Sequence, residues 1–371
     1  MIRLCFRLFS VHFLLQIQFF AMGIVRQEAE LEEFRRMLSC AAVNRRKAGD
    51  GFGGARVTAF PGDALDRMVC VTSGVSYLGI AIVNQLLLNG YSVRIIVDNE
   101  EDVEKLREME TSGEMRLNNS VVEVVMARLT ETQSLTEAFD GCRVVFHPAA
   151  FVDPAGLSGY SKAMAEIEVN TSKNVVRACG LSPSVRHCVL TSSLLACIWR
   201  DSSMRVIDHK CWSDESICVN KKLWYALGKL RAEKAAWEIA KASGVKLATI
   251  CPGLITGTDF YRRNPTPTIA YLKGAEEMYA YGLLATVSID TLAKAHVRVF
   301  EEMKKAAPGS RYICFDKVME RGDEVERLAA ETGISVASLT GGASSSCRPR
   351  YELSNAELRQ LMLRPQRCEN E

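Results

Sequence analysis

The sequence lacks the cysteine and histidine spacings that mark metal and redox sites. Its 371 residues include 13 cysteines and 5 histidines, but no CxxC pair, no HExxH motif and no two histidines one helical turn apart. Single cysteines in odd number are typical of small buried side chains in a reducing compartment, not of a disulfide framework. We therefore expect no metal ion and a cytoplasmic location.

An excess of either charge is also absent. The 46 Lys and Arg side chains against 44 Asp and Glu leave a net charge of +2, so bulk electrostatics favours neither nucleic acid nor an anionic membrane as a partner. A composition of 48% hydrophobic and 24% charged residues excludes a disordered or collagen-like chain. The length suits one large domain or two interlocked ones. We expect a monomer with a small-molecule substrate and no nucleic acid.

The N-terminal apolar run is too short, and too interrupted by Gln, for a membrane span. Residues 1–25 carry Arg3 and Arg7 before the run FLLQIQFFAMGIV, and in this they are similar to a signal peptide. The alternative is that translation starts at Met22. A membrane partner is expected only if residues 1–25 are a true signal or anchor. Residues 1–66 are predicted to be a partly disordered extension.

From Met68 onward, apolar β-branched runs alternate with segments of helical periodicity. Strands are predicted at residues 68–72, 91–98, 121–126, 142–150, 185–191 and 245–251. Helices are predicted at residues 80–90, 101–110, 135–139, 158–179 and 222–243. This alternation indicates βαβ units in a parallel sheet covered on both faces. We therefore predict a doubly wound α/β fold of the dinucleotide-binding (Rossmann) type over residues 67–251.

After Cys251 the alternation becomes less regular. Helices near 268–282 and 290–305, a strand at 311–315 and a helix from Ser354 predict a smaller substrate-binding lobe at 252–361. Residues 362–371 are predicted to be a flexible tail.

The turn after the first predicted strand reads TSGVSYLG, from Thr72 to Gly79. A glycine-containing turn between a strand and a helix can present backbone N–H groups to a pyrophosphate at the positive end of the helix. The predicted phosphate-binding residues are Ser73, Gly74, Ser76, Tyr77, Leu78 and Gly79. Because the motif has only two glycines, a turn of purely structural purpose is an open alternative.

Asp98 ends the second predicted strand. An acid at this place in the fold usually holds the adenosine ribose hydroxyls of NAD and repels a 2′-phosphate. The alternative is that Asp98 caps the helix that follows. Both roles are compatible with each other.

Ser193, Tyr225 and Lys229 are the candidate catalytic residues. Tyr225 and Lys229 form a YxxxK pair, and side chains four residues apart lie on one face of a helix. A nearby ammonium favours the phenolate, which makes the phenol a usable proton donor to a carbonyl oxygen that receives hydride. Ser193 follows a predicted strand at the ligand-binding end of the sheet, where its hydroxyl can bond the same oxygen. The alternative is a turn serine and a packed tyrosine.

Motifs along most of the chain carry a resemblance to a known family; they are VCVTSGVSYLG, DGCRVVFHPAAFVDP, VLTSSLLACIW, CWSDESIC, LWYALGK, CPGLITG and RYIC. From about Met68 to Leu361 the chain resembles the extended short-chain dehydrogenase/reductases of the plant cinnamoyl-CoA reductase and dihydroflavonol reductase family. It is most like a cinnamoyl-CoA reductase-like subgroup. The resemblance implies NADPH-dependent reduction of a phenylpropanoid-type CoA thioester or related carbonyl. It further implies that Lys229 binds the nicotinamide ribose, and that Ala149 and Pro252 lie beside the cofactor.

The chain departs from the family pattern around the cofactor. Ser73 and Ser76 stand where the fingerprint TGxxGxxG has Gly, so we expect their Cβ atoms to crowd the pyrophosphate, although a hydroxyl can donate to it. Asp98 stands where the family often has an Arg for the 2′-phosphate, with Lys105 as a candidate substitute. NADP and NAD therefore both stay open. Further departures are Arg128 for an adenine-contacting Asp, and Leu223, Ala226 and Leu227 in the signature NWYCYGK.

Two other functions stay open beside the reductase. A non-catalytic or weakly active dinucleotide-binding regulatory protein is favoured by the serines in the turn and opposed by the intact Ser193, Tyr225 and Lys229 set. A sugar-nucleotide epimerase shares that set, but its tightly bound NAD favours a complete glycine fingerprint.

Overall fold

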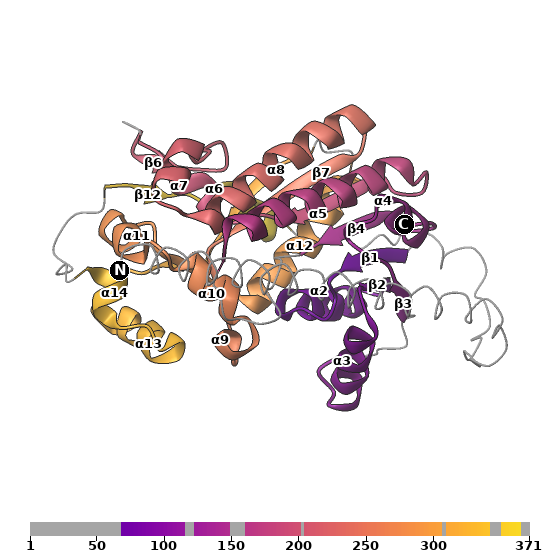
Figure 1. The fold of residues 1–371 in the computed structure, drawn as a ribbon, viewed down its shortest axis with the longest axis horizontal. Helices are drawn as coiled ribbons and strands as arrows, with labels where there is room; N and C mark the ends of the chain where they lie inside the picture. Colours follow the sequence, from indigo (N-terminus) through magenta and orange to yellow (C-terminus); the bar gives the residue numbers. More distant parts are fainter. Residues whose placement is uncertain are drawn as a thin grey trace, which may run out of the picture. The chain divides into compact units, whose positions relative to one another are not determined.

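The structure is a computed structural model that describes residues 68–115, 122–148, 160–201, 204–305, 309–341 and 350–364. Its largest sheet is built from β1 (Met68–Thr72), β2 (Ser92–Val97), β3 (Val122–Met126), β4 (Val144–His147), β5 (His187–Thr191), β7 (Lys246–Pro252) and β10 (Arg311–Cys314). These strands are all parallel, in the order β10-β7-β5-β4-β1-β2-β3 (Figure 1). The order reverses between β1 and β4, which is where such sheets bind ligands. The predicted doubly wound fold is confirmed.

Helices cover both faces of this sheet. One face carries α2 (Tyr77–Leu88), α3 (Glu100–Thr111), α12 (Ile289–Lys304) and α15 (Ala356–Leu363). The other carries α4 (Thr132–Ala138), α5 (Lys162–Leu181) and α8 (Trp224–Ser243), of which α5 and α8 lie side by side (Figure 1). Val69 and Val71 pack in the first interior and Cys70 in the second. Because both faces are covered, the strands read as near-continuous apolar runs.

A smaller part of the protein is built around a separate apolar cluster. Its elements are α6 (Leu195–Ile198), β6 (Val206–Ile207), α7 (Glu215–Asn220), β8 (Leu254–Thr256), α9 (Phe260–Arg263), α10 (Pro265–Tyr271), α11 (Ala275–Tyr281), β9 (Ala285–Ser288), β11 (Lys317–Val318), α13 (Gly322–Thr332), α14 (Val336–Thr340) and β12 (Glu352–Leu353). Strands β11, β9 and β8 form one small sheet, and β12 pairs with β6. In the described part of the chain, no helix combines the length and the apolar character that crossing a bilayer requires.

The single helix predicted at 268–282 is wrong, because α10 ends at Tyr271 and α11 begins at Ala275. Gly274 lies between them in the left-handed region, with φ of 87°. A Cβ at Gly274 would lie 2.7 Å from the Trp199 ring. The break therefore follows from a close approach to a side chain far away in the sequence.

Three elements of the segment 252–361 are part of the main α/β unit. Strand β10 pairs with β7, α12 packs against α2 and β7, and α15 packs against α12 and β10. Because β10 extends the parallel sheet and the two helices cover one of its faces, these elements complete the dinucleotide fold. The rest of that segment stays a prediction as a substrate-binding lobe. Helix α15 runs to Leu363, into the predicted tail, whereas the extension at 1–66 lies outside the described residues.

A buried ion pair ties β10 to α8. Arg311 donates from Nε to Glu233 Oε1 at 2.7 Å and from Nη2 to Oε2 at 3.1 Å, and the Glu233 carboxylate is 0% exposed. Ser192 Oγ and Thr249 Oγ1 also donate to this carboxylate, at 2.7 and 2.6 Å. The Arg311 guanidinium further donates to the carbonyl oxygens of three residues, Ala196, His209 and Cys211. One cation thus joins the main sheet to the segment that follows β5.

Replacing Arg311 with Leu should lower the free energy of unfolding by about 3–5 kcal/mol, because it leaves the Glu233 carboxylate buried without its counter-charge. Urea denaturation measures this loss. The matched control is Arg327→Leu, which breaks a pair with Asp323 in which Arg327 is 65% exposed. Exposed pairs contribute only about 0–1 kcal/mol. Equal losses in the two variants would contradict the role given to Arg311.

Candidate active site

The first βα turn is tightly packed at its two glycines. A Cβ at Gly74 would lie 2.4 Å from Cγ2 of Ile95 on β2. At Gly79 a Cβ would lie 2.2 Å from the carbonyl oxygen of Ser73. Because these neighbours are a buried strand and the backbone of the turn itself, any side chain would push α2 away from the sheet. Both glycines thus allow the close helix–strand contact that a dinucleotide turn needs.

The two serines of the turn have different backbone conformations. Ser73 has φ of 55°, in the left-handed region that favours glycine. Ser76 is extended and forms the N-cap of α2, where its Oγ accepts a hydrogen bond from Gly79 N–H at 3.0 Å. The N–H groups of Tyr77 and Leu78, at the first two helical positions, have no intrahelical acceptor. They and the helix dipole fit a pyrophosphate at this end of α2.

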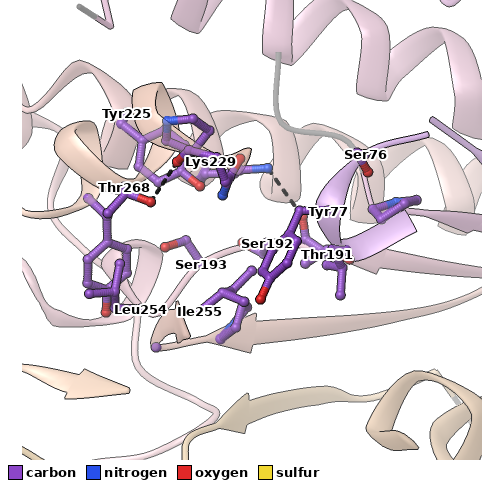
Figure 2. A pocket seen from close by; sticks show the side chains of 17 residues that line it. Ser76, Tyr77, Thr191, Ser192, Ser193, Tyr225, Lys229, Leu254, Ile255 and Thr268 are labelled. Atoms are coloured by element: carbon purple, nitrogen blue, oxygen red, sulfur yellow. Dashed lines mark hydrogen bonds between the residues drawn. The ribbon is translucent and has the colours of Figure 1, made fainter. Parts of the chain in front are cut away.

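The structure brings Ser193, Tyr225 and Lys229 to one cavity (Figure 2). Tyr225 lies in the first turn of α8 and Lys229 one turn later, with Nζ 5.9 Å from the centroid of the Tyr225 ring. Ser193 follows β5, and its Oγ accepts from Leu195 N–H at 3.2 Å. This hydrogen bond orients the Ser193 hydroxyl and leaves its proton for a carbonyl oxygen in the cavity.

The cavity joins these three residues to the first βα turn. Its described lining comes from that turn, from the residues after β4 and β5, from the end of β7 and from α10; it includes Ser76, Tyr77, Leu78, Pro148, Thr191, Ser192, Pro252, Gly253, Leu254, Ile255, Asn264, Pro267, Thr268 and Tyr271. A dinucleotide that has its pyrophosphate at α2 and its nicotinamide at Tyr225 fits this path. Among the predicted cofactor residues, Ala149 lies outside the described residues. No group of His, Cys, Asp and Glu side chains suited to a metal is found in the described ranges.

Asp98 lies at the carboxyl end of β2 and does not cap the next helix. The cap of α3 is Asn99, whose side chain accepts from Asp102 N–H at 2.9 Å. The capping alternative for Asp98 is therefore wrong, because the chain needs one more residue before its dihedral angles become helical. Burial and the Asp102 carboxylate raise the pKa of Asp98, against the opposing effect of Arg128.

Lys105, the candidate for a 2′-phosphate, and Arg128, whose charge acts on Asp98, both already contact acids. Lys105 Nζ lies 3.0 Å from Glu101 and 3.5 Å from Asp102. Arg128 lies 3.1 Å from Glu131. Each of these two cations is therefore next to a carboxylate that partly offsets its positive charge.

Lys229 has a partner that the sequence analysis missed. Its Nζ donates to Glu168 Oε1 of α5 at 2.7 Å and to the carbonyl oxygen of Thr191 at 3.4 Å. The side chains of Lys229 and Glu168 are only 3% and 2% exposed. The signal was present in the sequence, because Glu168 stands on the apolar face of α5 with Ala165, Ser172 and Val175.

The pair keeps Lys229 charged. Burial acts to lower the pKa of Lys229, but the attraction of Glu168, with smaller contributions from Tyr225 and Glu233, raises it overall. Burial raises the pKa of Tyr225 as well; Lys229 opposes this and Glu168 adds to it. Tyr225 is therefore a protonated phenol at neutral pH, the form that donates a proton. The Tyr160 ring packs edge-on against it, with centroids 5.0 Å apart.

Comparison with known proteins agrees with this geometry. Residues 70–279 match the 3-beta hydroxysteroid dehydrogenase/isomerase family. The chain belongs to this family. Cinnamoyl-CoA reductase 1 of Petunia hybrida is 36% identical over 310 residues, which cover 80% of this chain and 87% of the petunia chain. The predicted membership of the extended short-chain dehydrogenase/reductases, and with it an NAD(P)-dependent oxidoreductase, is confirmed.

Solved structures show the same fold. Vestitone reductase from alfalfa is 24% identical, with a TM-score of 0.58, covering 81% of this chain and 94% of that one. Yeast methylglyoxal/isovaleraldehyde reductase Gre2, solved in complex with NADPH, is 19% identical, with a TM-score of 0.59 and the same two coverages, 81% and 94%.

Replacing Ser73 with Gly should raise the free energy of unfolding by about 1 kcal/mol and tighten NAD(P)H binding. The change removes a left-handed strain of about 1–2 kcal/mol, partly offset by the greater freedom of glycine in the unfolded chain. Ser76→Gly should instead weaken binding by about tenfold, because the hydroxyl that accepts from Gly79 can donate its own proton to phosphate. Calorimetry on the two single variants measures both effects. Weaker binding in both would show that Ser73 is a phosphate ligand.

Proposed function

We propose that this protein uses NAD(P)H to reduce a phenylpropanoid-type CoA thioester or a related aromatic carbonyl compound. The observation that carries the proposal is the cavity shared by Ser193, Tyr225 and Lys229 and the first βα turn. Its other walls include Tyr271, Leu254 and Ile255, which suit a flat apolar acyl group. The name of the petunia relative supports a hydroxycinnamoyl thioester as the compound to try first.

The residues have separate roles in this reaction. Bound NAD(P)H supplies hydride to the carbonyl carbon. Ser193 donates a hydrogen bond to the carbonyl oxygen, and Tyr225 gives that oxygen its proton. Lys229 stabilises the phenolate that this transfer leaves behind. With a thioester, the new hydroxyl then gives up its proton as the carbon–sulfur bond breaks, and the leaving sulfur takes up a proton, which gives an aldehyde and the free thiol of CoA.

The direct test is an assay with hydroxycinnamoyl-CoA thioesters and the matching aldehydes, followed by the loss of reduced-nicotinamide absorbance. Turnover of at least one of these compounds supports the proposal. Binding of NAD(P)H without turnover of any of them would favour the regulatory protein instead, for which the strained Ser73 is the supporting observation. A cytoplasmic location and a monomeric state stay predictions.

Tyr225→Phe should reduce the rate of hydride transfer at least about 100-fold, the scale of a lost general acid. It removes only the proton donor, so the dissociation constant of NAD(P)H should stay unchanged. Single-turnover kinetics and fluorescence titration measure the two quantities. The matched control is Tyr279→Phe, whose hydroxyl lies 3.5 Å from the carbonyl oxygen of Glu320 in another part of the protein. Near-normal turnover in Tyr225→Phe would exclude Tyr225 as the acid.

We further propose that Asp98 makes NADH the better cofactor. What supports the proposal is that an acid at the end of the second strand of such folds usually holds the adenosine ribose, and that Lys105 and Arg128 each contact an acid of their own. Asp98→Arg should shift the ratio of the NADPH and NADH dissociation constants toward NADPH by about tenfold, or about 1.4 kcal/mol. Glu104→Arg, the same change on the exposed side of α3, is the control. An unchanged ratio in Asp98→Arg would show that Asp98 does not select the cofactor.

A further inference from the structure

Glu168 is the acidic side chain among the buried residues of α5. It lies on the face of α5 that packs against α8 and is 2% exposed. Moving a carboxylate out of water costs several kcal/mol, which only a well-placed counter-charge and hydrogen bonds offset. Here the counter-charge is Lys229 Nζ, 2.7 Å from Oε1. The pair therefore joins a buried acid to a residue of the reaction itself.

The approach of the two helices sets this distance. A Cβ at Gly228 would lie 3.0 Å from Cα and 3.1 Å from Cβ of Ala165. Gly228 directly precedes Lys229, and Ala165 lies one turn before Glu168 on the contact face. Because the helices meet through backbone and small side chains, the Glu168 carboxylate is held against the ammonium.

Several other ionisable groups surround Tyr225 and Lys229. They are Tyr160 just before α5, His147 from β4, Tyr271 from α10, Tyr77 from α2 and Glu233 from α8. His147 is neutral, because burial and the Lys229 charge lower its pKa to about 3. Glu233 is bound by Arg311, and burial keeps Tyr160 and Tyr271 protonated. Glu168 is thus the acid in this described set that contacts Lys229.

We propose that Glu168 is a positioning residue that offsets the charge of Lys229 and keeps Tyr225 in its phenol form, and so extends carbonyl reduction to higher pH. The role rests on the proposed reductase function. In reduction the phenol gives its proton to the carbonyl oxygen and becomes phenolate. In the reverse direction a phenolate must accept the proton of an alcohol. A lone ammonium stabilises that phenolate, and a carboxylate beside the ammonium opposes this effect.

Glu168→Gln tests the charge while keeping the shape, because the amide oxygen can still accept from Lys229 Nζ. Removing one neighbouring charge should lower the pKa of Tyr225 by about one unit. The alkaline limb of carbonyl reduction should then move to lower pH by that amount. The acid limb of alcohol oxidation should move to lower pH by the same amount. If both limbs stay at their wild-type pH, the proposal is overturned.

A second measurement needs neither cofactor nor substrate. In the apoprotein, tyrosinate absorbance is titrated for the wild type and for Glu168→Gln, each with and without Tyr225→Phe. The difference between the members of each pair belongs to Tyr225. Its midpoint should be lower in Glu168→Gln, and an equal or higher midpoint would contradict the proposal. This readout stands even if no substrate is found, so failure of the reductase function and failure of the Glu168 role are told apart.

Two further variants separate charge from structure. Glu166→Gln removes an exposed carboxylate from the same helix and should leave the pH profile unchanged. Glu168→Asp keeps the charge at a greater distance and should give a smaller shift in the same direction as Glu168→Gln. If Glu168→Gln does not fold, the Asp variant decides: an alkaline limb displaced upward, or not displaced, overturns the proposal.

Discussion

The close contact of α5 and α8 at Gly228 determines the geometry of the candidate catalytic residues. Gly228 stands between Tyr225 and Lys229 and packs on Ala165, where even a Cβ atom would make a tight contact of 3.0 Å. A larger residue there would separate the helices and stretch the 2.7 Å contact between Lys229 and Glu168. The YxxxK spacing places Tyr225 and Lys229 on one face of α8, but Gly228 between them allows this face to approach α5 closely. The packing of α5 on α8 and the ion pair between Lys229 and Glu168 therefore depend on each other.

In the first βα turn, glycine can be needed for two different reasons, either because a Cβ atom would clash or because the backbone has a positive φ. The glycine-rich fingerprint of the fold does not distinguish the two reasons. Gly74 and Gly79 are required by space, because a strand side chain and a carbonyl oxygen occupy the places of their Cβ atoms. At Ser73 the constraint is the backbone conformation, because φ is positive there, and the turn keeps this conformation although the residue is a serine. Ser76 has an ordinary extended backbone, so its side chain is free of strain and caps α2. The turn thus keeps its shape although its motif is incomplete.

The sequence predicted the parts of the structure that repeat locally. The apolar runs of the main sheet and the long amphipathic helices have periodicities that one segment reveals by itself, and β1, β2, β5 and α8 lie close to where these placed them. The elements between β5 and α8, and most of those after β7 apart from α12 and α13, are short, and tertiary contacts define them. The break at Gly274 is one such case, because its cause is the Trp199 ring. Ser193, Tyr225 and Lys229 were recognisable from spacing and order, whereas the partner of Lys229 depends on which helix packs beside α8.

The position of Arg311 late in the sequence also affects when its interactions can form during synthesis of the chain. Glu233, Ser192 and Thr249 are made before β10, and until Arg311 has left the ribosome their shared carboxylate has no guanidinium to bind. The segment from Ala196 to Cys211 waits for the same cation, since its carbonyl oxygens accept from it. A nascent chain that ends before β10 has the sequence of Ser193, Tyr225 and Lys229 but lacks the strand that holds their surroundings together. The candidate active site is therefore complete only after β10 has been made, and a chain that stops before Arg311 lacks the counter-charge of the Glu233 carboxylate.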